Sequence, residues 1–199
     1  MGPDSEHTSD SSLAERVLAL VKDAWPLGPK EYASIERSFN VQFSAHTERG
    51  AVLAAVAIVD AKLAALLKSR MIDSNLKTGF FKEGGTIGGL GVRTRLAYLL
   101  GLISKTMFQL LEIIREIRNK FAHSELDVGF AHADVQKLML KFPSAKEIHE
   151  VNWPAFKNIA TARYDVSQDS YRFISICVVL SMLISFAKFE SKPPSPPRF

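Results

Sequence analysis

Residues 104–124, SKTMFQLLEIIREIRNKFAHS, decide the fold class of this 199-residue chain. Apolar side chains recur here at the spacings i, i+3, i+4, i+7 and i+11, which place them in one stripe along a helix. The members of the stripe are Leu110, Ile113, Ile114, Ile117 and Phe121. Ser104 precedes the stretch and is a residue type that caps helices. The stretch therefore predicts a long amphipathic helix that buries one face.

Segments with helical spacing of apolar residues also flank this stretch on both sides. They cover residues 13–25, 31–43, 46–72, 92–103, about 134–141 and about 166–188. Alternating runs of β-branched residues, which are typical of strands, are few. These patterns predict an all-α fold, a compact bundle of six to seven helices. The last segment is apolar on nearly every side, so we expect it at the centre of the bundle.

A chain of this length is expected to form a single domain with one core. Residues 1–12 are polar and acidic, and residues 191–199 contain four of the nine prolines. Neither end is suited to a helix or a sheet. We expect a disordered acidic N-terminus (1–12), a helical domain (13–190) and a disordered Pro-rich tail (191–199).

The cysteine content and the apolar segments indicate where the protein works. Cys177 is the only cysteine, so a disulfide within one chain is impossible and a buried thiol in a reducing compartment is expected. Residues 173–187 come nearest to a membrane span, but a span needs about 20 residues. The N-terminus lacks the basic and then apolar pattern of a signal peptide. The sequence predicts a cytoplasmic protein without a membrane partner.

Five glycines fall within eight residues and predict a loop: Gly84, Gly85, Gly88, Gly89 and Gly91. The loop is no dinucleotide fingerprint, because Thr94 stands where that motif needs glycine. A phosphate-binding Gly-Lys-Ser/Thr triplet is also missing from the sequence. The histidines lack the pairwise spacing of metal ligands. We therefore expect no metal and no cofactor.

Positive charge is concentrated near the end of the predicted helix. The chain carries a net charge of +4, and since residues 1–12 hold three acidic and no basic residues, the rest carries +7. Arg115, Arg118 and Lys120 lie within six residues, and arginine forks suit phosphate groups. Arg93 and Arg95 complete the predicted binding set. Acidic Glu48 and Asp60 interrupt the apolar segment 46–72, and we expect them to pair with buried arginines such as Arg93 or Arg95.

Arg118 and His123 are candidates for proton-transfer chemistry on a phosphate diester. On a regular helix they point about 140° apart, whereas Asn119 and His123 are about 40° apart. Arg118 and His123 can meet only if the helix ends or tightens near Ala122, or if a second subunit completes the pair. A simpler interpretation is that basic residues and a histidine favour the negative end of a helix.

Two segments resemble the mannitol operon repressor (MtlR) family of bacterial regulators. The segments are GGLGVRTRLAYLLGLI (88–103) and IREIRNKFAH (114–123). The matching residues are Arg93, Arg95, Leu96, Tyr98, Gly101, Arg118, Asn119, Phe121, Ala122 and His123. The family commonly continues to an acidic pair, from which this sequence departs at residues 129–134. The resemblance implies an all-helical regulator of sugar-alcohol uptake that lacks a helix-turn-helix.

The Arg-x4-His signature formed by Arg118 and His123 is also similar to the HEPN superfamily. Its members include dimeric ribonucleases, toxins and RNA-binding proteins. The sequence therefore predicts a regulator that binds a protein partner or nucleic acid, as a homodimer. The alternative is a metal-independent endoribonuclease with Arg118, Asn119 and His123 as catalytic residues.

Overall fold

The computed structural model describes residues 47–82, 84–124, 128–142 and 168–189. These ranges form six α-helices and contain no strand, which confirms the all-α prediction. The helices are α3 (Glu48–Ser69), α4 (Leu76–Phe81), α5 (Leu90–Leu99), α6 (Lys105–His123), α7 (Ala133–Met139) and α10 (Gln168–Phe189). The helices expected at 13–25 and 31–43, and the two expected tails, lie outside the described residues.

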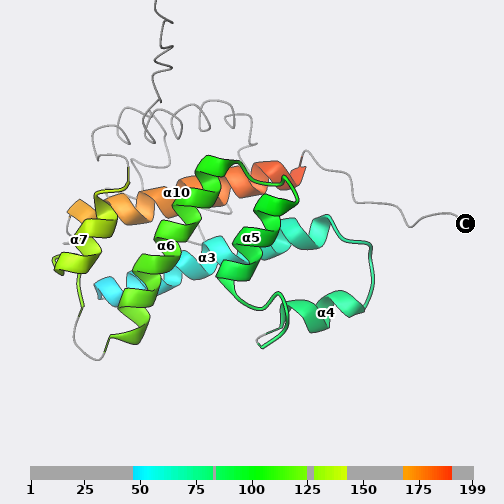
Figure 1. Cartoon of the computed structure of the whole chain (residues 1–199), viewed down its shortest axis with the longest axis horizontal. Helices are drawn as coiled ribbons and strands as arrows, with labels where there is room; N and C mark the ends of the chain where they lie inside the picture. Colours follow the sequence, from blue (N-terminus) through cyan, green and yellow to red (C-terminus); the bar gives the residue numbers. More distant parts are fainter. Residues whose placement is uncertain (1–46, 83, 125–127, 143–167, 190–199) are drawn as a thin grey trace, which may run out of the picture.

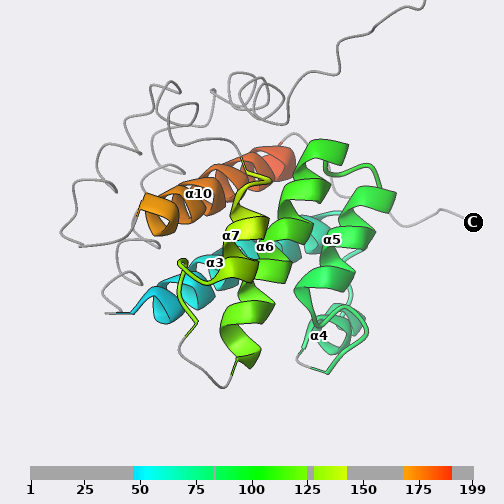
Figure 2. The ribbon, with the colours of Figure 1, turned by 60° about the vertical axis from the view of Figure 1, so that its left-hand side comes forward.

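Helix α3 occupies the centre of the described helices. It packs against α10, α5 and α6. Helix α10 lies beside α3 and runs in the same direction, while α5 and α6 form an antiparallel pair across α3 (Figures 1 and 2). At the C-terminal ends of α3 and α10, Arg70 Nη2 donates a hydrogen bond to the carbonyl oxygen of Ala187 at 3.2 Å. Among the described helices, α3 thus packs against three neighbours, and α10 packs along α3.

Helix α3 is also long and apolar enough to cross a membrane by length and composition alone. From the sequence, residues 173–187 were expected to come nearest to a span, and the length and composition of α3 were missed. In the structure, 56% of the most apolar 18-residue stretch of α3 is buried. A core helix with apolar residues on several sides has the same composition as a span. The packing of α3 on three neighbours accounts for its apolar character.

Helix α10 is the buried helix that the sequence predicts. Residues 173–185 are all buried, including the Cys177 side chain. Burial raises the pKa of the Cys177 thiol well above its ordinary value, because a thiolate has no solvation there. The Ser185 hydroxyl donates to the carbonyl oxygen of Ser181 at 2.8 Å. The polar group of Ser185 is thus satisfied by the backbone of its own helix.

Helix α6 follows the expected pattern closely. Ser104 caps it, since its hydroxyl accepts a hydrogen bond from the Met107 backbone N–H at 3.2 Å. Four members of the predicted stripe are fully buried, and Ile113 is partly buried against the core. The helix remains regular through His123. Its opposite face is therefore available to the neighbouring α5 and to solvent.

Helix α5 is shorter than the sequence predicts. The helix expected over residues 92–103 ends at Leu99, and it begins early enough to include Gly91. Gly101 has φ +67°, a left-handed conformation that favours glycine. The N–H groups of Gly101 and Leu102 bond to the carbonyl oxygens of Tyr98 and Ala97, both at 2.9 Å. This pair of bonds is a Schellman motif, and it terminates the helix despite the apolar residues that follow.

Helix α4 was not predicted from the sequence. The position of the acidic Glu48 is explained by the turn at residues 128–132, to which its side chain is hydrogen-bonded. One Glu48 carboxylate oxygen accepts a hydrogen bond from the Phe130 backbone N–H at 2.8 Å. A side chain at Gly129 would place its Cβ 2.8 Å from that same oxygen, so glycine permits the approach. Phe130 then packs between Phe121 of α6 and Phe173 of α10. Glu48 thereby fixes a turn to the start of α3.

Candidate functional site

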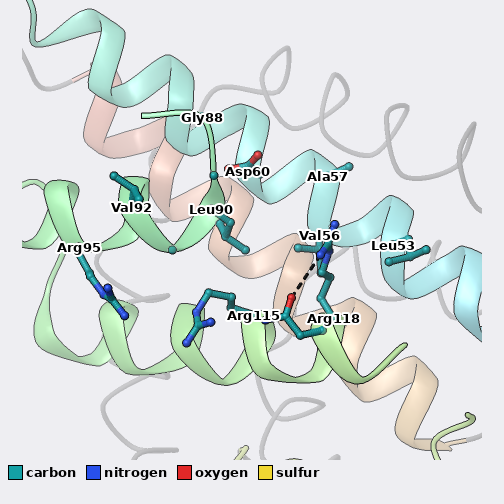
Figure 3. A pocket seen from close by; sticks show the side chains of 13 residues that line it. Leu53, Val56, Ala57, Asp60, Gly88, Leu90, Val92, Arg95, Arg115 and Arg118 are labelled. Atoms are coloured by element: carbon teal, nitrogen blue, oxygen red, sulfur yellow. Dashed lines mark hydrogen bonds between the residues drawn. The ribbon is translucent and has the colours of Figure 1, made fainter. Parts of the chain in front are cut away.

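A pocket of about 580 Å³ opens between α3, α5 and α6. Figure 3 shows α3 on one side and the basic side chains of α5 and α6 on the other. The lining residues from α3 are Leu53, Val56, Ala57 and Asp60; those from the glycine loop and α5 are Gly88, Gly89, Leu90, Gly91, Val92 and Arg95; those from α6 are Arg115, Arg118 and Asn119. The pocket thus combines an apolar wall with three guanidinium groups.

The glycine loop predicted at residues 84–91 forms part of the wall because its backbone is tightly packed. A Cβ at Gly85 would lie 2.5 Å from the carbonyl oxygen of Gly79, and a Cβ at Gly88 would lie 2.7 Å from that of Lys82. Backbone atoms cannot move aside as a flexible side chain does. Glycine at these two positions lets the loop fold back on α4 and deliver Gly88 and Gly89 to the pocket.

Arg93 is a structural residue that lies outside the pocket. Its side chain is 9% exposed and forms an ion pair with Asp60 at 2.5 Å. It also donates hydrogen bonds to the carbonyl oxygens of Ile87 at 2.8 Å and Phe81 at 3.1 Å. The expected pairing of Asp60 with a buried arginine is confirmed. These bonds occupy the guanidinium of Arg93, so the predicted binding role has no support from its position.

Arg115 faces the pocket from α6 and is held by its neighbour Glu112. The guanidinium donates to Glu112 Oε2 at 2.8 and 3.3 Å. This hydrogen bond is the main reason that the pKa of Arg115 is raised above its ordinary value. A Cβ at Gly91 would lie 3.1 Å from Cδ of Arg115, tighter than an ordinary contact. Glycine at the start of α5 therefore makes room for this side chain.

Arg118 and Arg95 line the same pocket, and neither has a carboxylate partner among the described residues. Arg118 extends from α6 toward α3, and its Nη1 donates to Oδ1 of Asn119 at 3.2 Å (Figure 3). Arg95 projects from α5 and is exposed. Within the described ranges, neither side chain forms an ion pair. Three of the five predicted binding residues, Arg95, Arg115 and Arg118, are thus brought together.

Lys120 and His123 lie apart from this pocket. Lys120 Nζ is 3.0 Å from Asp134 Oδ2 of α7, and its hydrogen bond lowers the pKa of the Asp134 carboxyl. His123 is exposed in the last turn of α6. Because α6 stays regular to its end, Arg118 and His123 do not converge within one chain. The catalytic roles of Arg118, Asn119 and His123 stay predictions without support from this geometry.

Comparison with known proteins gives one structural match. No protein-family model and no curated protein sequence matches the chain. The chain is similar to one in the X-ray structure of the MtlR–HPr complex from Escherichia coli, with a TM-score of 0.52 and 19% sequence identity. The match covers 78% of this chain and 99% of that chain. The chain has an MtlR-like fold. At this identity, the similarity concerns the fold alone.

The apolar wall of the pocket in this MtlR-like fold was missed from the sequence. Leu53 and Ala57 lie four residues apart on α3, beside the buried residues Val52, Val56 and Val59. Their position beside α5 and α6 depends on helix packing. The glycine-rich loop was a usable signal, since glycines often allow a backbone to approach a ligand. The described residues contain no group of three His, Cys, Asp or Glu side chains placed to hold a metal.

Proposed function

We propose that this chain is a regulatory protein of the mannitol-repressor type that acts by binding a partner protein. The supporting observation is the MtlR-like fold, since the matching chain comes from a structure of a complex with HPr. We assign the partner's contact to an exposed surface, here called the α5 outer face. It consists of Val92, Arg95, Tyr98, Leu99 and Leu100.

The α5 outer face has the composition of an interface core. Leu99 is 80% exposed, and Val92, Tyr98 and Leu100 are also exposed large apolar residues. Aromatic and arginine side chains are enriched where proteins bind one another. The Tyr98 ring stacks on Phe108 with 4.7 Å between centroids, so its conformation is already restricted. A fixed side chain loses less entropy on binding than a mobile one.

The partner expected on this surface is apolar with an acidic group near its centre. Arg95 supplies the positive charge of the face and has no ion-pair partner among the described residues. An acidic residue of the partner would form a charge-assisted hydrogen bond with it. HPr is the first partner to test, because it is the protein bound in the matching structure.

Calorimetric titration of the purified full chain with HPr tests the proposal. Leu99→Ser should weaken binding by about tenfold or more, because it removes an apolar contact at the centre of the face. Leu140→Ser is the matched control, since Leu140, the residue that follows α7, is also 80% exposed but lies outside the face. Equal effects of the two substitutions would remove the α5 outer face from the proposal. Absence of HPr binding would exclude an HPr-type partner.

Nucleic-acid binding, a homodimer and a cytoplasmic location stay predictions. Binding of DNA or RNA through phosphate contacts would weaken steeply with salt, so titrations at several salt concentrations test it. Light scattering of the purified protein measures the oligomeric state. Incubation with RNA in EDTA tests the ribonuclease alternative. Cleavage lost in both Arg118→Ala and His123→Ala would favour the enzyme over the regulator.

A further inference from the structure

We infer that the pocket between α3, α5 and α6 binds a small phosphorylated molecule. The phosphate would lie against the guanidinium groups of Arg95, Arg115 and Arg118, and the uncharged part of the ligand would lie against Leu53, Val56 and Ala57 of α3. This inference concerns a ligand site that shares Val92 and Arg95 with the α5 outer face, but it does not rest on the partner proposed above.

The charge balance of the pocket favours an anion. Asp60 is the carboxylate that lines it, and the ion pair with Arg93 at 2.5 Å neutralises that charge. Glu112 likewise offsets Arg115. Arg95 and Arg118 then remain as two cations without a carboxylate in the described chain. A phosphate monoester carries up to two negative charges and several acceptor oxygens, so it can satisfy both guanidinium groups.

The N-terminus of α5 adds to the positive electrostatic potential of the pocket. Leu90, Gly91 and Val92 form its first turn and line the pocket. The cap residue is Gly89, which has no side chain to bond the free N–H groups of the helix, and the first turn contains no acidic residue. The positive end of the helix is therefore not offset by a capping carboxylate, and it supports the charge of the three arginines.

Size and shape favour a small molecule over a polynucleotide. A volume of about 580 Å³ falls within the range typical of small-molecule pockets. Single-stranded nucleic acids bind along extended basic grooves with stacked aromatic side chains. The nearby cation Lys120 does not extend the pocket, because it pairs with Asp134 on α7. No aromatic side chain lines the pocket within the described residues.

The test is calorimetric titration of the full chain with phenyl phosphate, inorganic phosphate, the neutral benzyl alcohol and a single-stranded RNA decamer. We expect one molecule of phenyl phosphate to bind per chain, more tightly than inorganic phosphate, and no binding of benzyl alcohol. Arg95→Gln and Arg118→Gln should each weaken phenyl phosphate binding by about tenfold, the effect of one charge-assisted contact. Lys137→Gln on α7 is the control that removes an equal charge outside the pocket.

Several results would overturn the inference. Absence of phenyl phosphate binding excludes the site, and an equal loss in Lys137→Gln shows diffuse charge attraction. Equal affinity for inorganic phosphate removes the role of the α3 wall. RNA binding that is tighter than phenyl phosphate and depends on Arg118 favours nucleic acid instead. Arg95 is exposed and forms no ion pair with another described residue, so Arg95→Gln keeps the test valid if Arg118→Gln alters folding.

Discussion

Gly91 of α5 leaves space for the side chain of Arg115 on α6, because a Cβ at residue 91 would lie 3.1 Å from Arg115 Cδ. Alanine favours a helix over glycine by up to about 1 kcal/mol. Gly91→Ala should therefore leave thermal stability equal or higher. It should weaken phenyl phosphate binding by roughly fivefold, the net value of one hydrogen bond, because Arg115 must shift.

A double-mutant cycle with Arg115→Gln separates this effect from others. In the Arg115→Gln background, Gly91→Ala should cause no further loss of affinity, because the displaced guanidinium is already absent. Calorimetric titrations of the four proteins measure the coupling. Additive losses would show that Gly91→Ala acts on the pocket by another route.

Arg93 connects α5, α3 and the loop after α4, so its removal should destabilise the fold. Arg93→Met leaves Asp60 and two carbonyl oxygens without their donor. We expect the free energy of unfolding to fall by about 3 kcal/mol, as for a broken buried ion pair. Urea denaturation measures the change. The exposed control Arg95→Met should change stability by less than about 0.5 kcal/mol, and similar losses in both would contradict the structural role of Arg93.

Gly101 ends α5 with a backbone conformation that other residues adopt at a cost. Its φ is +67°, and Gly101→Ala should lower the free energy of unfolding by about 1 kcal/mol. Gly79→Ala on α4 is the control, since nothing lies within 4 Å of a Cβ there and the backbone is helical. The control should be neutral or stabilising. A neutral Gly101→Ala would show that the chain ends α5 in another way.

The Asp134–Lys120 contact predicts a stability difference that depends on pH. The hydrogen bond from Lys120 lowers the pKa of Asp134 in the folded state, so the folded state favours the charged carboxylate. The contact with Lys120 therefore stabilises the folded protein at pH values above the ordinary pKa of a carboxyl group. This stabilisation is lost as the pH falls through the lowered pKa of Asp134. Denaturation of wild type and Asp134→Asn should therefore differ near about pH 7 and converge near about pH 2. When Lys120→Met is also present, Asp134→Asn should change the stability near neutral pH by a smaller amount.

Local sequence signals determined much of the helical structure. The stripe from Leu110 to Phe121 is buried, and Ser104 caps α6 as its residue type suggests. An acidic residue inside an apolar segment indicated the pairing of Asp60 with Arg93. These features depend on helical periodicity or on the high cost of an unpaired buried charge, and both can be recognised from a short segment.

The composition of the pocket could not be predicted from the sequence in the same way. Arg115, Arg118 and Lys120 are close in the chain, but each residue turns about 100° around the helix. Arg118 and Lys120 therefore point in nearly opposite directions, so Arg118 lines the pocket together with Arg115, whereas Lys120 pairs with Asp134. The apolar wall comes from α3, which is distant in sequence. Its position depends on how three helices pack together.

Arg95 and Val92 belong both to the lining of the pocket and to the α5 outer face. A molecule in the pocket and a protein on the face would compete for, or share, the same two side chains. Their binding free energies are then coupled, and the coupling acts equally in both directions. A metabolite that alters the partner's affinity must have its own affinity altered by the partner to the same degree. One helix would thus make this chain an effector-responsive adaptor without any large conformational change.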